Sequence, residues 1–97
     1  MNKERIDYKQ AYYYTLFSNI SGTRNKYYVL QSYSTIIAIY NSTTGEFYKN
    51  KNYYSTITSR HYSCFLDIIG ISPNTIIEME KDGIEQFFTD LKRSEVE

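Results

Sequence analysis

Thr35-Ile36-Ile37-Ala38-Ile39-Tyr40 is the most strand-like run of the chain, because it is rich in β-branched residues and apolar on both faces. We expect it to be a central strand of a sheet. Residues 27–32, just before it, alternate well enough to form a strand as well. Ser34 between the two runs is not an obvious tight turn, so one long, bent strand is an alternative to two strands.

Two glycines mark predicted ends of the segments that follow, one in a turn and one after a helix. Asn41-Ser42-Thr43-Thr44-Gly45 predicts a hairpin turn, with Gly45 supplying a positive φ angle, and residues 46–49 then return as a strand. From Thr58 the apolar period changes to that of a helix, whose buried face would carry Tyr62, Phe65, Leu66 and Ile69. Gly70 stands where a left-handed residue would end this helix.

The two ends of the chain complete the predicted order. Residues 77–80 alternate apolar residues with glutamates as an edge strand does, and Asp82-Gly83-Ile84-Glu85 has the spacing of a capped helix start. Residues 4–20 combine a helical stripe with a tyrosine-rich run of strand propensity, and we predict a helix there. The order (α)-β-β-β-α-β-α indicates an α+β fold, a small antiparallel-rich sheet with helices packed on one face.

Length and composition indicate one globular domain over residues 1–97. Hydrophobic residues make up 41% and charged residues 23% of the chain, the balance of a folded rather than a disordered protein. No apolar run approaches the roughly 18 residues that cross a bilayer, and the charged start leads into no signal-peptide core. The single cysteine, Cys64, fits a reducing compartment. We therefore expect a cytoplasmic protein with no membrane partner.

Charge and tyrosine are unevenly divided along the chain. Residues 1–66 carry eight Lys/Arg and three Asp/Glu, a net charge of +5, whereas residues 67–97 carry three and eight, a net charge of −5. All 12 tyrosines lie between Tyr8 and Tyr62, within the basic part. Interleaved tyrosine and basic residues suit stacking on bases and contacts to phosphates. The division favours a binding protein over an enzyme.

The basic and aromatic candidates for partner binding cluster around the third predicted strand and the helix start after it: Tyr48, Lys49, Lys51, Tyr53, Tyr54, Arg60 and His61. Tyr27, Tyr33 and Tyr40 could join them across a sheet. Such a surface can bind single-stranded nucleic acid, and exposed tyrosine with arginine is equally typical of a protein interface. Alternatively, most of the tyrosines fill a core that lacks tryptophan.

The acidic candidates lie in the last third of the chain: Glu78, Glu80, Asp82, Glu85 and Asp90. They either form the solvated side of a strand and an amphipathic helix, or imitate a row of phosphates. A protein of the second kind would occupy the basic channel of a nucleic-acid enzyme and gain from electrostatic steering.

Catalytic and metal chemistry has little support in the sequence. One histidine and one cysteine exclude a two-histidine or cysteine-rich zinc site, and the four glycines stand too far apart for a phosphate-binding loop. His61 and Cys64 are three residues apart on the predicted helix, but a nucleophilic pair also needs a cleft and an orienting group. We predict a non-catalytic protein with no metal and no cofactor.

Two stretches carry a family resemblance: Ser32-Tyr33-Ser34-Thr35-Ile36-Ile37-Ala38-Ile39-Tyr40, then Tyr53-Tyr54-Ser55-Thr56-Ile57-Thr58-Ser59-Arg60-His61 with Phe65-Leu66 after it. They resemble a group of small proteins carried by phages and mobile elements of Gram-positive bacteria, over about residues 27–66. Ile57 departs from the group's pattern, in which threonine is common. The resemblance implies that Thr58, Ser59, Arg60 and His61 are shared residues, in either a functional role or a helix-capping one.

The resemblance also implies an accessory gene of a mobile element acting in the host bacterial cytoplasm. Small phage proteins of this size often inhibit host defence enzymes, including CRISPR nucleases, so the leading hypothesis is an anti-CRISPR-like inhibitor whose partner is a host nuclease or other nucleic-acid-handling protein. The first alternative is a nucleic-acid-binding accessory protein that uses the basic tyrosine-rich sheet face. The second is an assembly protein that forms a homodimer through an edge strand.

Overall fold

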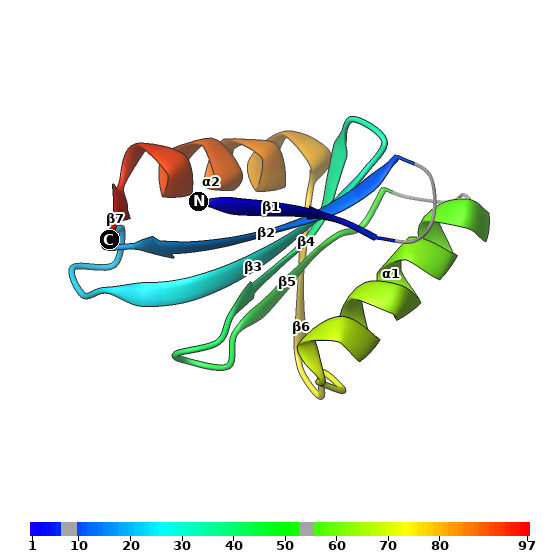
Figure 1. Ribbon diagram of the computed structural model, residues 1–97, viewed down its shortest axis with the longest axis horizontal. Helices are drawn as coiled ribbons and strands as arrows, with labels where there is room; N and C mark the ends of the chain where they lie inside the picture. Colours follow the sequence, from blue (N-terminus) through cyan, green and yellow to red (C-terminus); the bar gives the residue numbers. More distant parts are fainter. Residues whose placement is uncertain (7–9, 53–55) are drawn as a thin grey trace.

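The computed structural model describes residues 1–6, 10–52 and 56–97, which form one sheet between two helices (Figure 1). Its elements in chain order are β1 (Asn2–Arg5), β2 (Ala11–Ser18), β3 (Asn25–Ser32), β4 (Thr35–Asn41), β5 (Phe47–Asn50), α1 (Thr56–Ile69), β6 (Ile76–Met79), α2 (Lys81–Arg93) and β7 (Glu95–Val96). The α+β class and the antiparallel-rich sheet are confirmed. In the described residues no helix has the length and apolar character needed to cross a membrane.

The sheet is an antiparallel meander with one parallel addition. Strands β1 to β5 pair in sequence order, and β6 then pairs in parallel with β5 after the chain has passed through α1. The short β7 lies beside β2, with Phe17 opposite Val96, so that β1 and β7 share the outer side of β2. Strand β4 lies inside the sheet between β3 and β5, as its two-sided apolar sequence predicts.

Two separate cores lie on the opposite faces of the sheet. The core under α2 consists of Tyr14, Leu16, Tyr27, Val29, Ile36, Ile39, Ile84, Phe88 and Leu91. The core under α1 consists of Ile6, Ala11, Leu30, Ile37, Ala38, Phe47 and Phe65. The prediction that the helices share one face is therefore corrected. A central strand with apolar side chains on both faces must be covered on both, and each helix covers one.

The N-terminal segment forms the strands β1 and β2, and the predicted helix over residues 4–20 is wrong. Strand β2 pairs with β3 along its whole length and buries alternate residues such as Tyr14 and Leu16. The strand propensity of the tyrosine run, once paired, outweighs the short helical stripe. On the other face the Tyr13 hydroxyl donates to the Glu4 carboxylate, which together with burial raises the pKa of Tyr13 to about 12.

Residues 33 and 34 form a two-residue turn, so β3 and β4 are a hairpin and not one bent strand. Tyr33 adopts the left-handed conformation with φ +56°, which the sequence did not predict because tyrosine rarely adopts it. Its N–H donates to Gln10 O at 2.6 Å, and its carbonyl accepts from Gln31 Nε2 at 2.7 Å. These two bonds hold a turn that the residue type alone would not specify.

The two glycine signals are confirmed. Gly45 has φ +85° and donates its N–H to Asn41 O at 2.8 Å, which closes the β4–β5 turn. Gly70 has φ +71° and donates to Leu66 O at 2.8 Å, which ends α1. Both positions require a backbone conformation that favours glycine over residues with a Cβ atom.

Candidate functional site

His61 is part of a buried polar cluster between α1 and the end of β3. Its Nδ1 lies 2.8 Å from Ser32 Oγ, which in turn lies 3.1 Å from Thr58 Oγ1. His61 has no solvent-exposed surface, and burial lowers the pKa of its imidazole because the charged form loses its hydration. Thr58 lies inside α1 and does not cap it. Because His61 is buried in the folded protein, the prediction that it contacts a partner protein is corrected, and it instead helps to hold α1 on the sheet.

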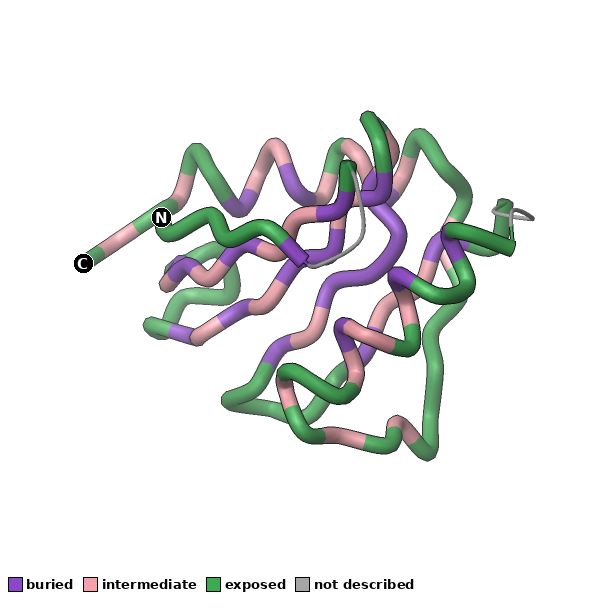
Figure 2. Tube along the Cα trace, turned by 45° about the vertical axis from the view of Figure 1, so that its right-hand side comes forward, coloured by how far each residue is buried: buried purple, intermediate pink, exposed green. Residues whose placement is uncertain are grey.

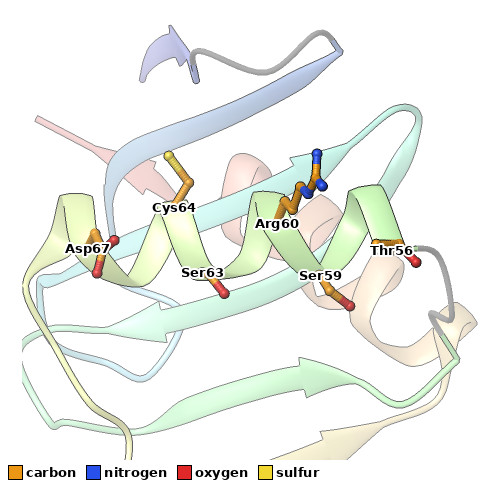
Figure 3. Close-up of a pocket in the computed structure, with 6 residues that line it drawn as sticks. All are labelled: Thr56, Ser59, Arg60, Ser63, Cys64 and Asp67. Atoms are coloured by element: carbon orange, nitrogen blue, oxygen red, sulfur yellow. The ribbon is translucent and has the colours of Figure 1, made fainter.

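Arg60 lies on the opposite, outward side of α1. With five other residues of that helix it lines an open groove of about 340 Å³, formed by Thr56, Ser59, Arg60, Ser63, Cys64 and Asp67 (Figure 3). Cys64 is half-buried in this groove, whereas His61 is fully buried, so the helix does not present the two as a nucleophilic pair in one cleft. The described residues contain no cluster of His, Cys, Asp and Glu that could hold a metal ion.

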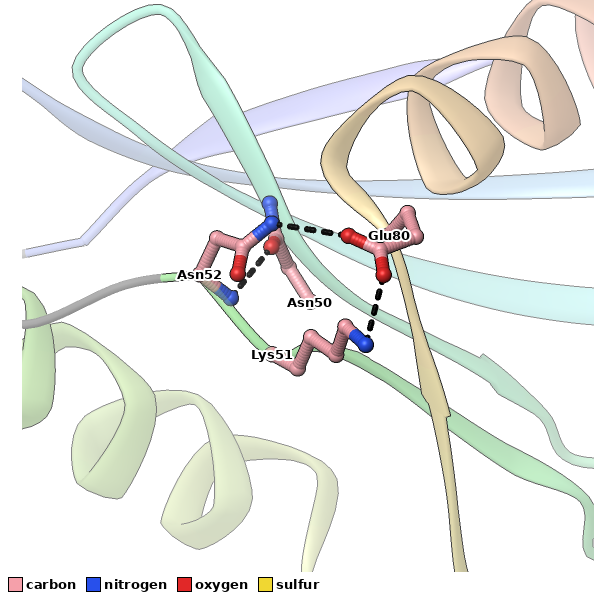
Figure 4. Close-up of polar contacts among 4 residues, drawn as sticks. All are labelled: Asn50, Lys51, Asn52 and Glu80. Atoms are coloured by element: carbon pink, nitrogen blue, oxygen red, sulfur yellow. Dashed lines mark hydrogen bonds and ion pairs between the residues drawn. The ribbon is translucent and has the colours of Figure 1, made fainter.

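Lys51 and Glu80, one from each predicted binding set, interact with each other. Lys51 Nζ lies 2.5 Å from Glu80 Oε1, and Asn52 Nδ2 donates to Glu80 Oε2 at 3.2 Å (Figure 4). The bond from Lys51, followed by that from Asn52, lowers the pKa of Glu80 because both favour the carboxylate. Lys51 N also donates to Met79 O at 3.0 Å. Glu80 thus ties the chain after β5 to the end of β6.

Of the remaining acidic candidates, some form hydrogen bonds within the protein and others are exposed to solvent. Glu85 accepts a hydrogen bond from the Ile36 N–H at 2.9 Å, which joins α2 to the start of β4. Asp82 does not cap α2, because the helix begins at Lys81 with Glu80 as its N-cap residue. Glu78 and Asp82 are exposed. A continuous row of phosphate-like carboxylates is therefore interrupted by the engagement of Glu80 and Glu85.

Tyr48 and Lys49 point to opposite faces of the sheet, as neighbours on a strand must. The Tyr48 ring packs edge-on against Phe87 of α2 at 5.0 Å between centroids, and burial, followed by the nearby Glu46, raises the pKa of its hydroxyl. Lys49 Nζ lies 4.6 Å from the Tyr62 ring centroid on the α1 side. Tyr53 and Tyr54 lie outside the described residues. Tyr48 and Lys49, two described members of the predicted basic and aromatic cluster, therefore lie on different faces of the sheet.

A different aromatic and basic group forms on the α1 face, which we call the tyrosine face: Phe17, Arg24, Lys26, Tyr28 and Tyr40. Tyr28 and Tyr40 are cross-strand partners with rings stacked 6.4 Å apart. Lys26 Nζ lies 5.1 Å from the Tyr28 centroid, and the Arg24 guanidinium 3.7 Å from that of Phe17. Phe17, Arg24 and Lys26 were not predicted as part of such a group, because the β2–β3–β4 register is what brings them beside the tyrosines.

The β6 edge combines an open strand with an apolar groove. Among the described strands, β6 pairs with β5 alone, and its Ile76 and Ile77 are 38% and 39% exposed. Figure 2 shows this strand as a largely exposed run beside the buried interior of the sheet. On the α2 face, next to β6, lies a groove of about 420 Å³ lined by Tyr48, Met79, Gly83, Gln86, Phe87 and Asp90.

These features define a small α+β protein with an open sheet edge beside an apolar groove and a tyrosine-rich area on one sheet face. Residues 1–85 match the model of a family described as a family of unknown function (DUF8033), and the chain belongs to that family. Searches of the curated proteins and of the solved structures gave no significant match.

Proposed function

We propose that this protein is a non-catalytic accessory protein of a phage or mobile element that binds a host defence nuclease and inhibits it. The observation that carries the proposal is the β6 edge, where exposed isoleucines and an apolar groove lie beside exposed carboxylates. Such a combination of apolar contact area and charge suits recognition of another protein. A nuclease is the expected partner because it must carry a basic channel for its nucleic acid.

Charge supports the same partner. Residues 76–91 contain five acidic residues and one lysine, a net charge of −4. Glu78 and Asp82 are exposed in this segment, and Asp90 lines the groove. An acidic surface of this kind would be steered towards a basic channel and would compete with nucleic acid for it.

The test is an affinity purification of the tagged protein from bacterial lysate that contains a CRISPR nuclease, with and without digestion of nucleic acid. Recovery of the nuclease in stoichiometric amount after digestion, together with loss of its cleavage activity, is the expected result. Replacement of Glu78 and Asp82 by lysine should weaken both. Recovery that depends on intact nucleic acid would instead contradict inhibition by direct contact.

Nucleic-acid binding is a second candidate, favoured by the tyrosine face. Its stacked Tyr28 and Tyr40 rings are half-buried and lie beside Lys26, an arrangement that suits base stacking with phosphate neutralisation. A labelled oligothymidylate followed by fluorescence anisotropy tests it. Lys26→Glu should weaken binding several-fold and reduce its salt dependence, whereas the matched charge reversal Lys81→Glu on α2 should not. Equal effects of the two reversals would rule out a specific site on this face.

A further inference from the structure

We infer that β6 captures an extended, basic segment of the partner protein by strand addition, with an apolar side chain of that segment seated in the groove beside Met79. This inference deepens the proposed function and rests on it. It specifies the partner as a β-strand in which apolar residues alternate with lysine or arginine. Main-chain hydrogen bonds would supply affinity, and the groove would supply selection among side chains.

The backbone of β6 is available on one side. Met79 directs its carbonyl towards the β5 end of the sheet, where it accepts from Lys51 N at 3.0 Å. Successive residues of a strand direct their N–H and C=O groups to alternate edges. Ile76 and Glu78 therefore direct theirs away from β5, towards the edge at which the described sheet ends.

The opposite edge of the sheet is protected more strongly than β6, which has a single charged residue, Glu78. Strand β1 consists of Asn2, Lys3, Glu4 and Arg5, and charged side chains discourage another strand from pairing. It is also tied to β7, because the Met1 amino group lies 2.5 Å from Glu95 Oε2. Natural proteins protect exposed edges with charged side chains, so an edge with one such residue and with Ile76 and Ile77 exposed indicates a surface that is used.

The side-chain positions of β6 explain the required sequence of its partner. Ile77 and Met79 are in register with Tyr48 and Asn50 and share the face of α2, next to the groove. Glu78 is in register with Lys49 and lies on the face of α1. A strand added beside β6 would therefore place apolar residues on the groove side and basic residues on the side of Glu78.

Charge also selects this occupant over a second copy of the chain. Two β6 edges would bring together the exposed Glu78 and Asp82 of each copy, and like charges close to a strand pair are destabilising. A basic strand neutralises the same carboxylates. The occupant is accordingly a different protein, and homodimerisation through β6 is an outcome that the experiment can reveal.

The experiment uses the full chain labelled with ¹⁵N and a short, end-blocked peptide that alternates lysine with valine around a central leucine. We expect amide exchange at Ile76 and Glu78 to slow on binding. Glu78→Pro removes the outward N–H at an edge position that tolerates proline, and should weaken binding by about tenfold or more. Glu78→Gln keeps the N–H and should cost only about two- to fivefold.

Gly83→Leu is the second probe, because it fills the groove without removing a core side chain. A Cβ at this helical position meets only Met79 Cε, at 3.6 Å, which is ordinary contact. We expect Gly83→Leu to lower the affinity for the peptide by about tenfold, whereas Gly83→Ala, with the same backbone, should lower that affinity less. The same peptide with glutamate in place of lysine should not bind. Amide spectra and thermal melts establish that each variant is folded.

Three outcomes would overturn strand addition: unchanged peptide affinity in folded Glu78→Pro and Gly83→Leu, perturbation of Tyr28 and Lys26 in place of β6, or exchange protection of β6 that rises with protein concentration without peptide. The failure of the proposed function is a separate result. If the protein binds the peptide at β6 but no nuclease is recovered with it, strand addition at β6 is supported and the nuclease is excluded as its target. If Glu78→Pro inhibits the nuclease as well as the wild-type protein does, the proposed function is supported and strand addition is excluded as its mechanism.

Discussion

Ser32 at the end of β3 and the α1 residues Thr58 and His61 are remote in sequence, and the structure brings their side chains together. They meet inside the protein, where the Ser32 hydroxyl lies within hydrogen-bond distance of both of the other side chains. All three are buried. Moving α1 away from β3 would break these hydrogen bonds and leave buried polar groups unpaired, which is costly in free energy. The cluster therefore fixes the position of α1 relative to β3.

Ser32→Ala should lower the free energy of unfolding by about 1–3 kcal/mol, because it leaves His61 and Thr58 without the hydroxyl between them. Urea denaturation followed by circular dichroism measures the change. The control is Ser63→Ala on the exposed side of α1, which should be neutral or slightly stabilising. If the two alanine variants unfold at the same urea concentration, the cluster does not hold the helix.

The pH dependence of stability should report His61. Its pKa in the folded protein is lowered from the ordinary 6.5, so below that pH the unfolded chain binds a proton that the folded protein does not. This contribution to stability is fully present above pH 6.5 and declines as the pH falls towards the lowered folded pKa. Urea titrations between about pH 7.5 and about pH 5.5 measure it. His61→Asn should remove this slope, and an unchanged slope would assign it to other groups.

The secondary-structure elements show which signals are local. The end of α1 was predicted from Gly70, because a left-handed residue at the end of a helix forms its hydrogen bond with the last turn of that same helix. Strand β2 was predicted as a helix, because its identity depends on pairing with β3, which no local pattern reveals. The start of α2 was predicted at Asp82, but Glu80 takes the N-cap position while binding Lys51.

Two glycine substitutions should change stability in opposite directions. Gly70→Ala forces a Cβ into a φ of +71° and should destabilise by about 1 kcal/mol. Gly83→Ala lies in a helical conformation with room for the methyl group and should stabilise by about 0.5–1 kcal/mol. Thermal unfolding of both variants measures whether each substitution raises or lowers the stability. Equal signs would mean that helix propensity and left-handed strain do not control these sites.

At the scale of the whole molecule, one sheet serves two cores. Strand β3 contributes Val29 to the core under α2 and Leu30 to the core under α1, and β4 likewise contributes to both. Neither helix can leave without exposing one face of the same central strands. We therefore expect a single cooperative unit, although the two helices cover opposite faces.

A matched pair of leucine substitutions tests this cooperativity. Leu91→Ala empties part of the core under α2, and Leu30→Ala part of the core under α1, and each should cost about 2–5 kcal/mol. Both should shift one transition, by about 4–8 °C for each kcal/mol lost. Differential scanning calorimetry measures it. A split transition in either variant would show two separately unfolding halves.

The sequence by itself determined the α+β class, the two-sided apolar strand at residues 35–40, the β4–β5 turn and the end of α1. These features depend on side-chain periodicity and on single-residue backbone preferences, which neighbouring residues set. Only the tertiary structure placed the helices on opposite faces, buried His61 and paired Lys51 with Glu80. The open β6 edge beside its groove and the stacked Tyr28 and Tyr40 also belong to this second group. Each of those depends on contacts between residues remote in sequence, such as Glu85 with Ile36, and strand register decides which residues meet.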